Sequence, residues 1–202
     1  MFSKYLIRNI SLGVFFFMLF PLASALAADR YRIEITNVKS RLKADVIWAS
    51  TNPYQGVFLW PDNGSASQEF DLLDSGNGYF RIQARHSGQC LMLDWRQGSH
   101  NGTNIIQYPY CGTGYSPAEW RRGWVNDPVI CNGNICTSTS GSLPVLVNRF
   151  SGKCLDARNQ YGGAPGQQAI LQQWDCVRTT RDWNIGNQAW GIAIPGQIER
   201  YL

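Results

Sequence analysis

The sequence lacks most of the residues from which catalytic centres are built. It has only two histidines, His86 and His100. It contains no HExxH zinc motif, no CxxC pair and no GxSxG nucleophile motif, so hydrolysis by a bound metal or an activated serine has no evident apparatus. A glycosidase pair of carboxylates can lie far apart in a chain, and sequence does not exclude it. We expect a protein that is not an enzyme and holds no metal and no cofactor.

Charge is also sparse. Only 16% of the residues are charged, and the formal net charge is +4. The lysines and arginines are scattered along the chain instead of being gathered into a dense basic stripe. Such a stripe is what binding to nucleic-acid phosphates requires. We therefore expect no nucleic-acid partner.

Only one long apolar run is present, and it lies near the N-terminus. Lys4 and Arg8 precede an apolar run over residues 10–22, which "ASALA" follows with small residues at the two positions before a cleavage. The run is about 13 residues long, shorter than the roughly 20 that a membrane-spanning helix needs. This pattern is typical of a secretory signal peptide, which we predict over residues 1–27.

The remaining residues, 28–202, have the length of one domain with a substantial core. We expect this domain to be secreted or periplasmic, without insertion into a membrane. Six cysteines fall in it, and an even number in an exported chain indicates three disulfides. Many pairings are possible, but the separation from Cys90 to Cys111 is similar to that from Cys154 to Cys176, which suggests that the same disulfide-closed loop occurs twice. The remaining pair, in "CNGNIC", would close a small ring. The pairs are then Cys90 with Cys111, Cys154 with Cys176, and Cys131 with Cys136.

The cysteines belong to an internal repeat. The stretches "RHSGQCLMLD" (85–94) and "RFSGKCLDAR" (149–158) share Arg, Ser, Gly, Cys and Leu in the same order, and each leads to a second cysteine through "NIIQYPYC" or "AILQQWDC". A fainter copy starts with the alternating "YRIEIT", which is typical of a half-buried strand. It places Leu42 at the first cysteine position and Asp62 at the second. We predict repeats at about 31–77, 78–125 and 144–187, with an insert at about 123–143.

Short strands with Gly, Asn, Asp and Ser at the turns, and no helical periodicity, predict an all-β chain. Three units that cannot each bury an apolar face alone favour a closed, threefold arrangement around one shared core. We expect Phe70, Trp120 and Trp183 to meet in that core. Trp190 falls outside the repeat pattern, and we expect its segment to pack on the domain as an extra strand.

The motifs "SGKCLDAR", "LQQWDC" and "DW" resemble the ricin B-type lectin domain with its QxW repeats. The resemblance extends over residues 31 to 190, and the first repeat adds "VFLWPDNGSASQEF", with Gln68 and Phe70 at the QxW positions. It implies a β-trefoil and a non-catalytic carbohydrate-binding protein. Galactose and N-acetylgalactosamine are the commonest ligands of that family.

The resemblance also implies a sugar site in the third repeat. Asp156 matches the family's hydroxyl-binding acid, Gln172 its amide and Trp174 its aromatic residue, while Asn159 lies on a loop that adds a polar contact. This combination suits a sugar, because an aromatic plate covers the C–H face of the ring. A carboxylate makes strong hydrogen bonds to hydroxyl groups, and an amide both donates and accepts.

One position departs from the family. The Asn-Gln that precedes the last x-W falls at Thr180 and Arg181, and Arg181 could pair with Asp156, either ordering it or blocking it. The other two repeats retain Gln107 and Trp60 but are expected to be silent. Unsuitable residues stand at their remaining site positions: Met92 and Pro109 in the second repeat, and Ala44 and Phe58 in the first.

Two other functions stay open. Trefoil lectins of this type also serve as receptor-binding or scaffolding subunits of secreted toxins that resemble cytolethal distending toxin. Exposed Trp60, Tyr108 and Tyr110 would suit such an interface, because exposed aromatic patches mark interaction sites. A gene for an exported enzyme beside this one would favour that function. A trefoil protease inhibitor would instead use the "CNGNIC" loop as its protruding segment.

Overall fold

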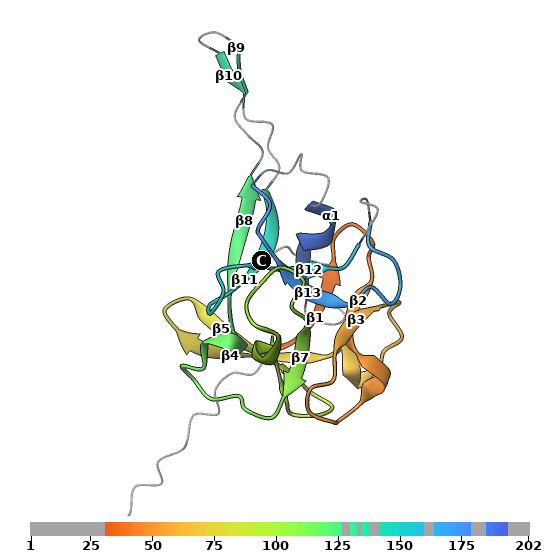
Figure 1. Ribbon diagram of the computed structural model, residues 1–202. Coiled ribbons are helices and arrows are strands. Elements are labelled where there is room, and N and C mark those ends of the chain that lie inside the picture. The colour runs from red at the N-terminus through yellow and green to blue at the C-terminus, as the bar shows by residue number, and fades with distance from the viewer. Residues whose placement is uncertain are drawn as a thin grey trace, which may run out of the picture.

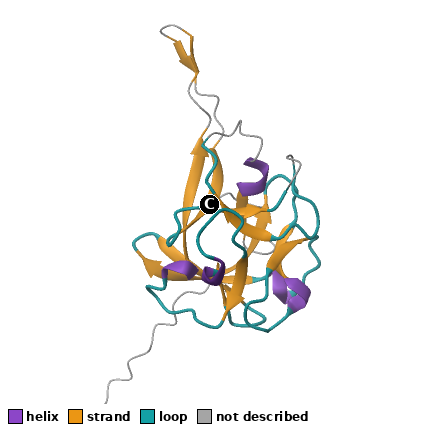
Figure 2. Cartoon of the chain, in the orientation of Figure 1, coloured by secondary structure: helices purple, strands orange, loops and turns teal. Residues whose placement is uncertain are grey.

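The chain is built almost entirely of short strands joined by turns (Figure 1; Figure 2). The structure, a computed structural model, describes residues 31–126, 130–132, 135–137, 142–159, 164–178 and 185–193. The predicted signal peptide lies outside these residues. Across the described ranges, the structure contains no helix of the length and apolarity needed to cross a membrane. The prediction of an all-β fold is confirmed.

Twelve strands fall into three sets of four. The first set is β1 (Tyr31–Asn37), β2 (Lys43–Val46), β3 (Val57–Trp60) and β4 (Phe70–Gly76). The second is β5 (Tyr79–Ala84), β6 (Cys90–Leu93), β7 (Ile105–Tyr108) and β8 (Glu119–Asn126). The third is β11 (Ser142–Asn148), β12 (Cys154–Ala157), β13 (Leu171–Trp174) and β14 (Trp190–Ala193).

The remaining elements are short. A two-stranded ribbon, β9 (Ile130–Asn132) and β10 (Ile135–Thr137), falls between β8 and β11 in sequence. The single-turn helices are η1 (Ile47–Ala49), η2 (Ala66–Gln68), η3 (Trp95–Gln97), η4 (Ser116–Ala118) and α1 (Ile185–Gln188). The ribbon sets Cys131 and Cys136 opposite each other in the backbone register. Their side chains lie outside the described part, so their disulfide stays a prediction.

The three sets repeat one pairing scheme. The outer strands join in the order β14-β1-β4-β5-β8-β11 to form a barrel-like sheet, and the inner strands of each set form the hairpins β2–β3, β6–β7 and β12–β13. Outer strands around a barrel with one hairpin for each of three units make a β-trefoil. The predicted fold class is therefore confirmed. The last strand, β14, pairs with the first, β1, and β11 at the other end of this row is in contact with β14.

One register position makes the three units comparable residue by residue. Each hairpin is joined to its first strand through one pair, Thr36 with Lys43, Gln83 with Cys90, and Val147 with Cys154. Lys43 therefore corresponds to the first cysteine of the other units, and the expectation that Leu42 does so is wrong by one residue. Such a slip matters because successive strand side chains point to opposite faces.

The core aromatic residues follow the same correspondence. Phe70 and Trp120 are fully buried, as predicted, and so is Trp190. The indole Nε1 of Trp120 donates to the backbone oxygen of Leu91 (3.1 Å), and that of Trp190 donates to the backbone oxygen of Leu155 (2.9 Å). These two leucines each follow the first cysteine of their unit, so Trp120 and Trp190 are equivalent.

Trp190 is therefore the core aromatic residue of the third unit. The interpretation that it lies outside the repeat pattern is wrong, because the last connection is longer than the repeat spacing suggests. Trp183, which we expected in this role, lies outside the described residues.

Two disulfides tie hairpins to the loops that follow them, Cys90–Cys111 and Cys154–Cys176. In the first unit the corresponding residues are charged, and Lys43 Nζ lies 4.0 Å from Asp62 Oδ2. An ion pair thus stands where the other units have a covalent bond.

Candidate functional site

Three of the predicted site residues lie together on the third hairpin. Asp156 in β12 is directly opposite Gln172 in β13, and Trp174 follows two residues later, on the same face. Gln172 Nε2 donates to Asp156 Oδ1 (2.8 Å). Only 3% of Asp156 is exposed, whereas Trp174 is 42% exposed. The acid therefore lies deep and the indole stands at the open edge.

A residue that sequence reasoning missed supports the acid. Gln188 Nε2 donates to Asp156 Oδ2 (3.2 Å) and to the backbone oxygen of Asp175 (3.0 Å), while its Oε1 accepts from the backbone N–H of Val177 (2.9 Å). Gln188 thus joins the carboxylate to the strand end beside the disulfide.

This placement corrects the expected departure from the family pattern. Gln188, preceded by Asn187, occupies the supporting amide position that we assigned to Arg181. Thr180 and Arg181 lie outside the described residues. The sequence did carry the signal: "NQAW" at 187–190 is a complete Asn-Gln-x-Trp match.

Burial dominates the electrostatics of the acid. It raises the pKa of Asp156 to about 6, because the ionised carboxylate is disfavoured away from water. The hydrogen bonds from Gln172 and Gln188, and the charge of Arg158, act in the opposite direction. Asp156 is therefore mainly ionised at neutral pH and gains a proton near pH 6.

Arg158 connects the acid to a neighbouring hollow. Its Nε donates to Gln172 Oε1 (3.1 Å), and a terminal nitrogen donates to Asn104 Oδ1 (3.1 Å). Arg158 and Asn159, with residues 166–170, line a hollow of about 280 Å³. Asn159, the fourth predicted site residue, is thus next to the residue that orders Gln172.

A loop of the second unit supports Trp174 from the side. Asn101 Nδ2 donates to Asp175 Oδ2 (2.8 Å), and the backbone N–H of Asp175 donates to Asn101 Oδ1 (3.0 Å). Gly102 lies beside Trp174, and a Cβ there would lie 3.8 Å from Trp174 Cζ3, at ordinary van der Waals distance. Its φ of +88°, and not a lack of space, is what favours glycine at this position.

The second hairpin differs from the expectation by one residue. Its register places Ile106 opposite Met92, and Tyr108 opposite Cys90. Gln107 is therefore not at the amide position, nor Pro109 at the aromatic one, because the segment before Cys111 is one residue longer than in the third unit. Gln107 instead donates from Nε2 to the backbone oxygens of Ser50 (2.7 Å) and Asn52 (2.8 Å), holding a loop of the first unit.

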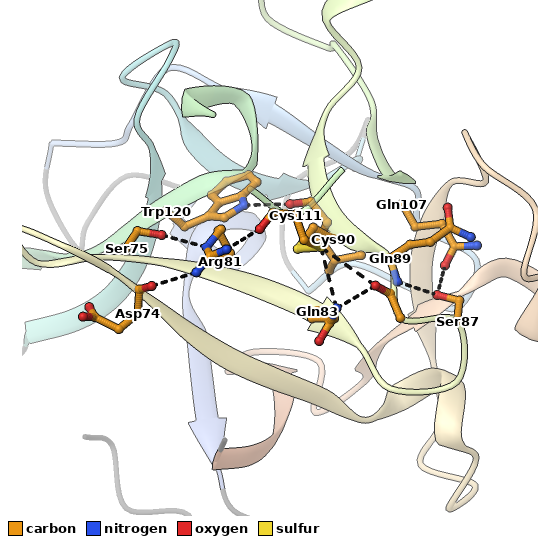
Figure 3. The surroundings of a disulfide bond; sticks show 12 residues. Asp74, Ser75, Arg81, Gln83, Ser87, Gln89, Cys90, Gln107, Cys111 and Trp120 are labelled. Carbon is orange, nitrogen blue, oxygen red and sulfur yellow. Dashed lines mark hydrogen bonds between the residues drawn. A yellow bond between two sulfur atoms is a disulfide. The ribbon is translucent and has the colours of Figure 1, made fainter. Parts of the chain in front are cut away.

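Polar groups around the disulfide of the second unit, Cys90–Cys111, are likewise used for structure (Figure 3). Arg81 donates to Ser75 Oγ (2.9 Å) and to the backbone oxygens of Asp74 (2.8 Å) and Cys111. Gln83 Nε2 donates to the backbone oxygen of Gly88 (2.7 Å). The Arg81 bonds hold Cys111 beside the end of β4, and the Gln83 bond holds the turn between β5 and β6.

The first hairpin has an acid where none was expected. Asp45, not Ala44, is opposite Phe58 and occupies the position of Asp156. The error follows from aligning Leu42 with the first cysteine, and Ala44 is a fully buried core residue. Gln68 Nε2 donates to Asp45 Oδ2 (3.0 Å), as Gln188 does to Asp156.

No group of three or more His, Cys, Asp or Glu side chains arranged to hold a metal occurs among the residues that the structure describes. The candidate sites are thus made of carboxylates, amides and aromatic rings.

The comparisons with known proteins agree with this geometry. The model of the family described as "Ricin-type beta-trefoil lectin domain-like" matches residues 20–108. No match was found among curated proteins. The designed 3-fold symmetric protein ThreeFoil is 28% identical with a TM-score of 0.61, and the match covers 80% of this chain and 96% of ThreeFoil.

Two further solved structures share the fold at lower identity. The ricin B-like lectin of Macrolepiota procera, in complex with lactose, is 19% identical (TM-score 0.57; 81% of this chain and 95% of that one). A cytolethal distending toxin chain from Actinobacillus actinomycetemcomitans is 12% identical (TM-score 0.56; 84% and 95%). The chain has the ricin-type β-trefoil lectin fold, and its resemblance to the ricin B-type lectins is confirmed.

Proposed function

We propose that this chain is an exported carbohydrate-binding protein that takes galactose-type sugars on its third unit through Asp156, Asn159, Gln172 and Trp174. The observation that carries the proposal is the buried carboxylate of Asp156 on the hairpin face that bears a half-exposed indole. This carboxylate receives hydrogen bonds from Gln172 on the hairpin and from Gln188 in α1. The lectin of Macrolepiota procera, with the same fold, is described in complex with lactose.

Each group has a distinct task in this proposal. Trp174 covers the C–H face of the sugar ring, and contact with this face favours sugars that present one continuous apolar side. Asp156 accepts hydrogen bonds from neighbouring hydroxyl groups, and these are strong because the acceptor is charged. Gln172, already oriented by Arg158 and Asp156, adds a second polar contact. Gln188 positions the carboxylate without touching the sugar.

A glycan array tests the proposal with three samples: the purified protein, Asp156→Ala and Trp174→Ala. We expect binding to galactose-type glycans by the parent protein and its loss in both variants. Binding that is unchanged in both variants would place the site elsewhere and contradict the assignment.

A second candidate function rests on an aromatic cluster that joins the second unit to Tyr54 of the first. Tyr54 and Tyr110 are exposed, whereas Trp60 and Tyr108, which we expected to be exposed, are partly buried. Neighbouring ring centroids in the cluster lie 4.8 to 6.2 Å apart. The cluster consists of Tyr54, Trp95, Tyr108, Tyr110 and Tyr115. Such a patch is typical of a protein interface. We propose, as the alternative, a receptor-binding or scaffolding subunit of a secreted toxin, which the fold of the cytolethal distending toxin chain supports.

The alternative is tested by co-purification with an exported enzyme encoded beside this chain. A Tyr54→Ser, Tyr110→Ser double variant should lose the partner and keep any sugar binding. Partner binding that survives this change would contradict the role of the cluster.

A further inference from the structure

The first unit contains a pocket that the sugar proposal does not use. It has a volume of about 190 Å³ and lies against the face of β3, with η1 beside it. One acid and three aromatic side chains dominate its walls: Asp45, Trp48, Phe58 and Trp60. Asp45, Phe58 and Trp60 share the face that carries Asp156, Gln172 and Trp174 in the third unit.

The three rings form a bent aromatic wall. Phe58 and Trp60 are nearly parallel, with an interplanar angle of 20° and centroids 5.3 Å apart. Trp48 is tilted by 56° to Phe58 at a centroid distance of 6.2 Å. Trp48 is 77% exposed, so its ring gains little from the protein core. Such exposure of a tryptophan at the rim of a pocket suits contact with a ligand.

Trp48 is also held in an unusual backbone conformation. Its φ of 59° lies in the left-handed region, as does the φ of 50° of Ala49. Residues other than glycine adopt this region rarely, and when they do so the surroundings must hold them there. The loop that follows is anchored to the second unit, because Gln107 and His86 both contact the backbone oxygen of Ser50. The position of Trp48 is therefore set by the fold.

The carboxylate of Asp45 supplies the charge of the pocket. Gln68 donates to it (3.0 Å), and no lysine or arginine is among the described residues that line the pocket. Ser65 and Ser67 also line the pocket, but their hydroxyl groups bond each other (2.8 Å), and Ser67 also bonds Asp45. The negative charge therefore lies beside three aromatic rings, and the neighbouring hydroxyl groups already have partners within the protein.

This combination does not match a sugar as well as the third unit does. Phe58 stands where Gln172 stands, so no amide lies opposite the acid as it does in the third unit. The amide of Asn63 also lines the pocket, but its Oδ1 already accepts from the backbone N–H of Ser65 (2.9 Å). The faces of aromatic rings carry negative charge and attract organic cations, and aromatic cages recognise quaternary ammonium groups. A nearby carboxylate strengthens that attraction without needing a directional donor.

We propose that the first-unit pocket binds a small organic cation with a trimethylammonium group, held against the rings of Trp48 and Trp60, which the buried ring of Phe58 supports, and beside the carboxylate of Asp45. The site is independent of the sugar site of the third unit. Such a group can come from a free choline-like solute or from a phosphatidylcholine headgroup.

Isothermal titration of the full protein with choline chloride tests the proposal against 3,3-dimethylbutan-1-ol, the neutral analogue of the same shape. Saturable binding of choline is expected, at least about tenfold tighter than that of the alcohol. Sedimentation with phosphatidylcholine vesicles distinguishes the two sources, because only headgroup recognition brings the protein down with lipid.

Variants locate the binding. Trp48→Ala and Asp45→Asn should each weaken choline binding about tenfold. Trp48 is exposed, so its loss should leave the fold intact, as near-UV circular dichroism can verify. Trp174→Ala should bind choline normally. The proposal is overturned if the alcohol binds as well as choline, if the folded protein shows no saturable binding of choline, or if Trp48→Ala abolishes galactose binding instead.

Discussion

Gln188 donates a hydrogen bond from Nε2 to Oδ2 of Asp156, 32 residues earlier in the chain. The same relationship joins Gln68 to Asp45 in the first unit. In each case the glutamine also donates to a backbone oxygen near the end of the hairpin, Asp175 or Pro61. The QxW glutamine thus fixes a carboxylate on the hairpin face while the aromatic residue two positions later fills the core.

Replacing Gln188 by methionine should both destabilise the protein and weaken sugar binding. The change removes the hydrogen-bond acceptor of Val177 N–H and one of the donors to the buried Asp156. This loss should lower the unfolding free energy by about 2 kcal/mol. Urea unfolding and a galactose titration measure the two effects. Gln68→Met is the matched control and should cost similar stability at unchanged sugar affinity. Equal sugar affinity in both variants would contradict the positioning role of Gln188.

Asp156 should make stability depend on pH. Its pKa rises from 3.8 to about 6 on folding, so the folded state holds the proton more tightly. The unfolding free energy should therefore decrease as pH rises from about 4 to about 6, by up to about 3 kcal/mol from this group alone. Asp156→Asn removes that contribution.

Denaturant titrations of the parent protein and of Asp156→Asn across this pH range give the difference between their unfolding free energies. The contributions of the other titrating groups cancel in that difference. A constant difference between the two curves would show that the carboxyl titrates normally. Sugar binding, which uses the ionised form, should weaken as pH falls below about 6.

Removing the disulfide of the third unit should lower both stability and sugar affinity. The bond joins cysteines 22 residues apart in sequence. Because a loop of this length gains much freedom in the unfolded chain once the bond is lost, the unfolding free energy of a Cys154→Ser, Cys176→Ser variant should fall by about 3 kcal/mol. The loss should extend to the site, because Asp175 beside Cys176 holds Gln188. The Cys90–Cys111 disulfide closes a separation of 21 residues. Its removal should cost similar stability and leave sugar affinity unchanged, as calorimetry and titration can check.

Trp190 should be essential for the core. It is fully buried and bonded to Leu155, so Trp190→Ala should lower the unfolding free energy by about 4 kcal/mol. Trp124 is 48% exposed, and Trp124→Ala should cost less than about 1 kcal/mol. Thermal unfolding of the two variants compares them directly. Similar melting temperatures would contradict the placement of Trp190 in the core.

Much of the fold was predictable because the trefoil repeats its signals. Two cysteine loops marked the second and third units, an alternating strand marked the first, and Phe70 and Trp120 fell in the core as expected. The closing strand was missed because the connection before it is longer than in the other units. Spacing therefore favoured Trp183, although the complete motif ended at Trp190.

The strand register of the hairpins was the part of the fold that the sequence did not determine. In the first unit no cysteine marks the hairpin, and the choice of Leu42 over Lys43 exchanged Ala44 for Asp45. In the second unit one additional residue before Cys111 moved Gln107 off the site face. Strand side chains alternate between faces, so each single-residue error exchanged a residue on the site face of the hairpin for one on the opposite face.

The most direct test of the central claim follows the indole N–H signals of the eight tryptophans during a galactose titration by nuclear magnetic resonance. Trp174→Phe identifies the signal of Trp174 by its absence. The account predicts that this signal shifts with galactose while those of Trp48 and Trp60 do not. Shifts confined to Trp48 or Trp60, or none at all, would contradict a sugar site on the third unit.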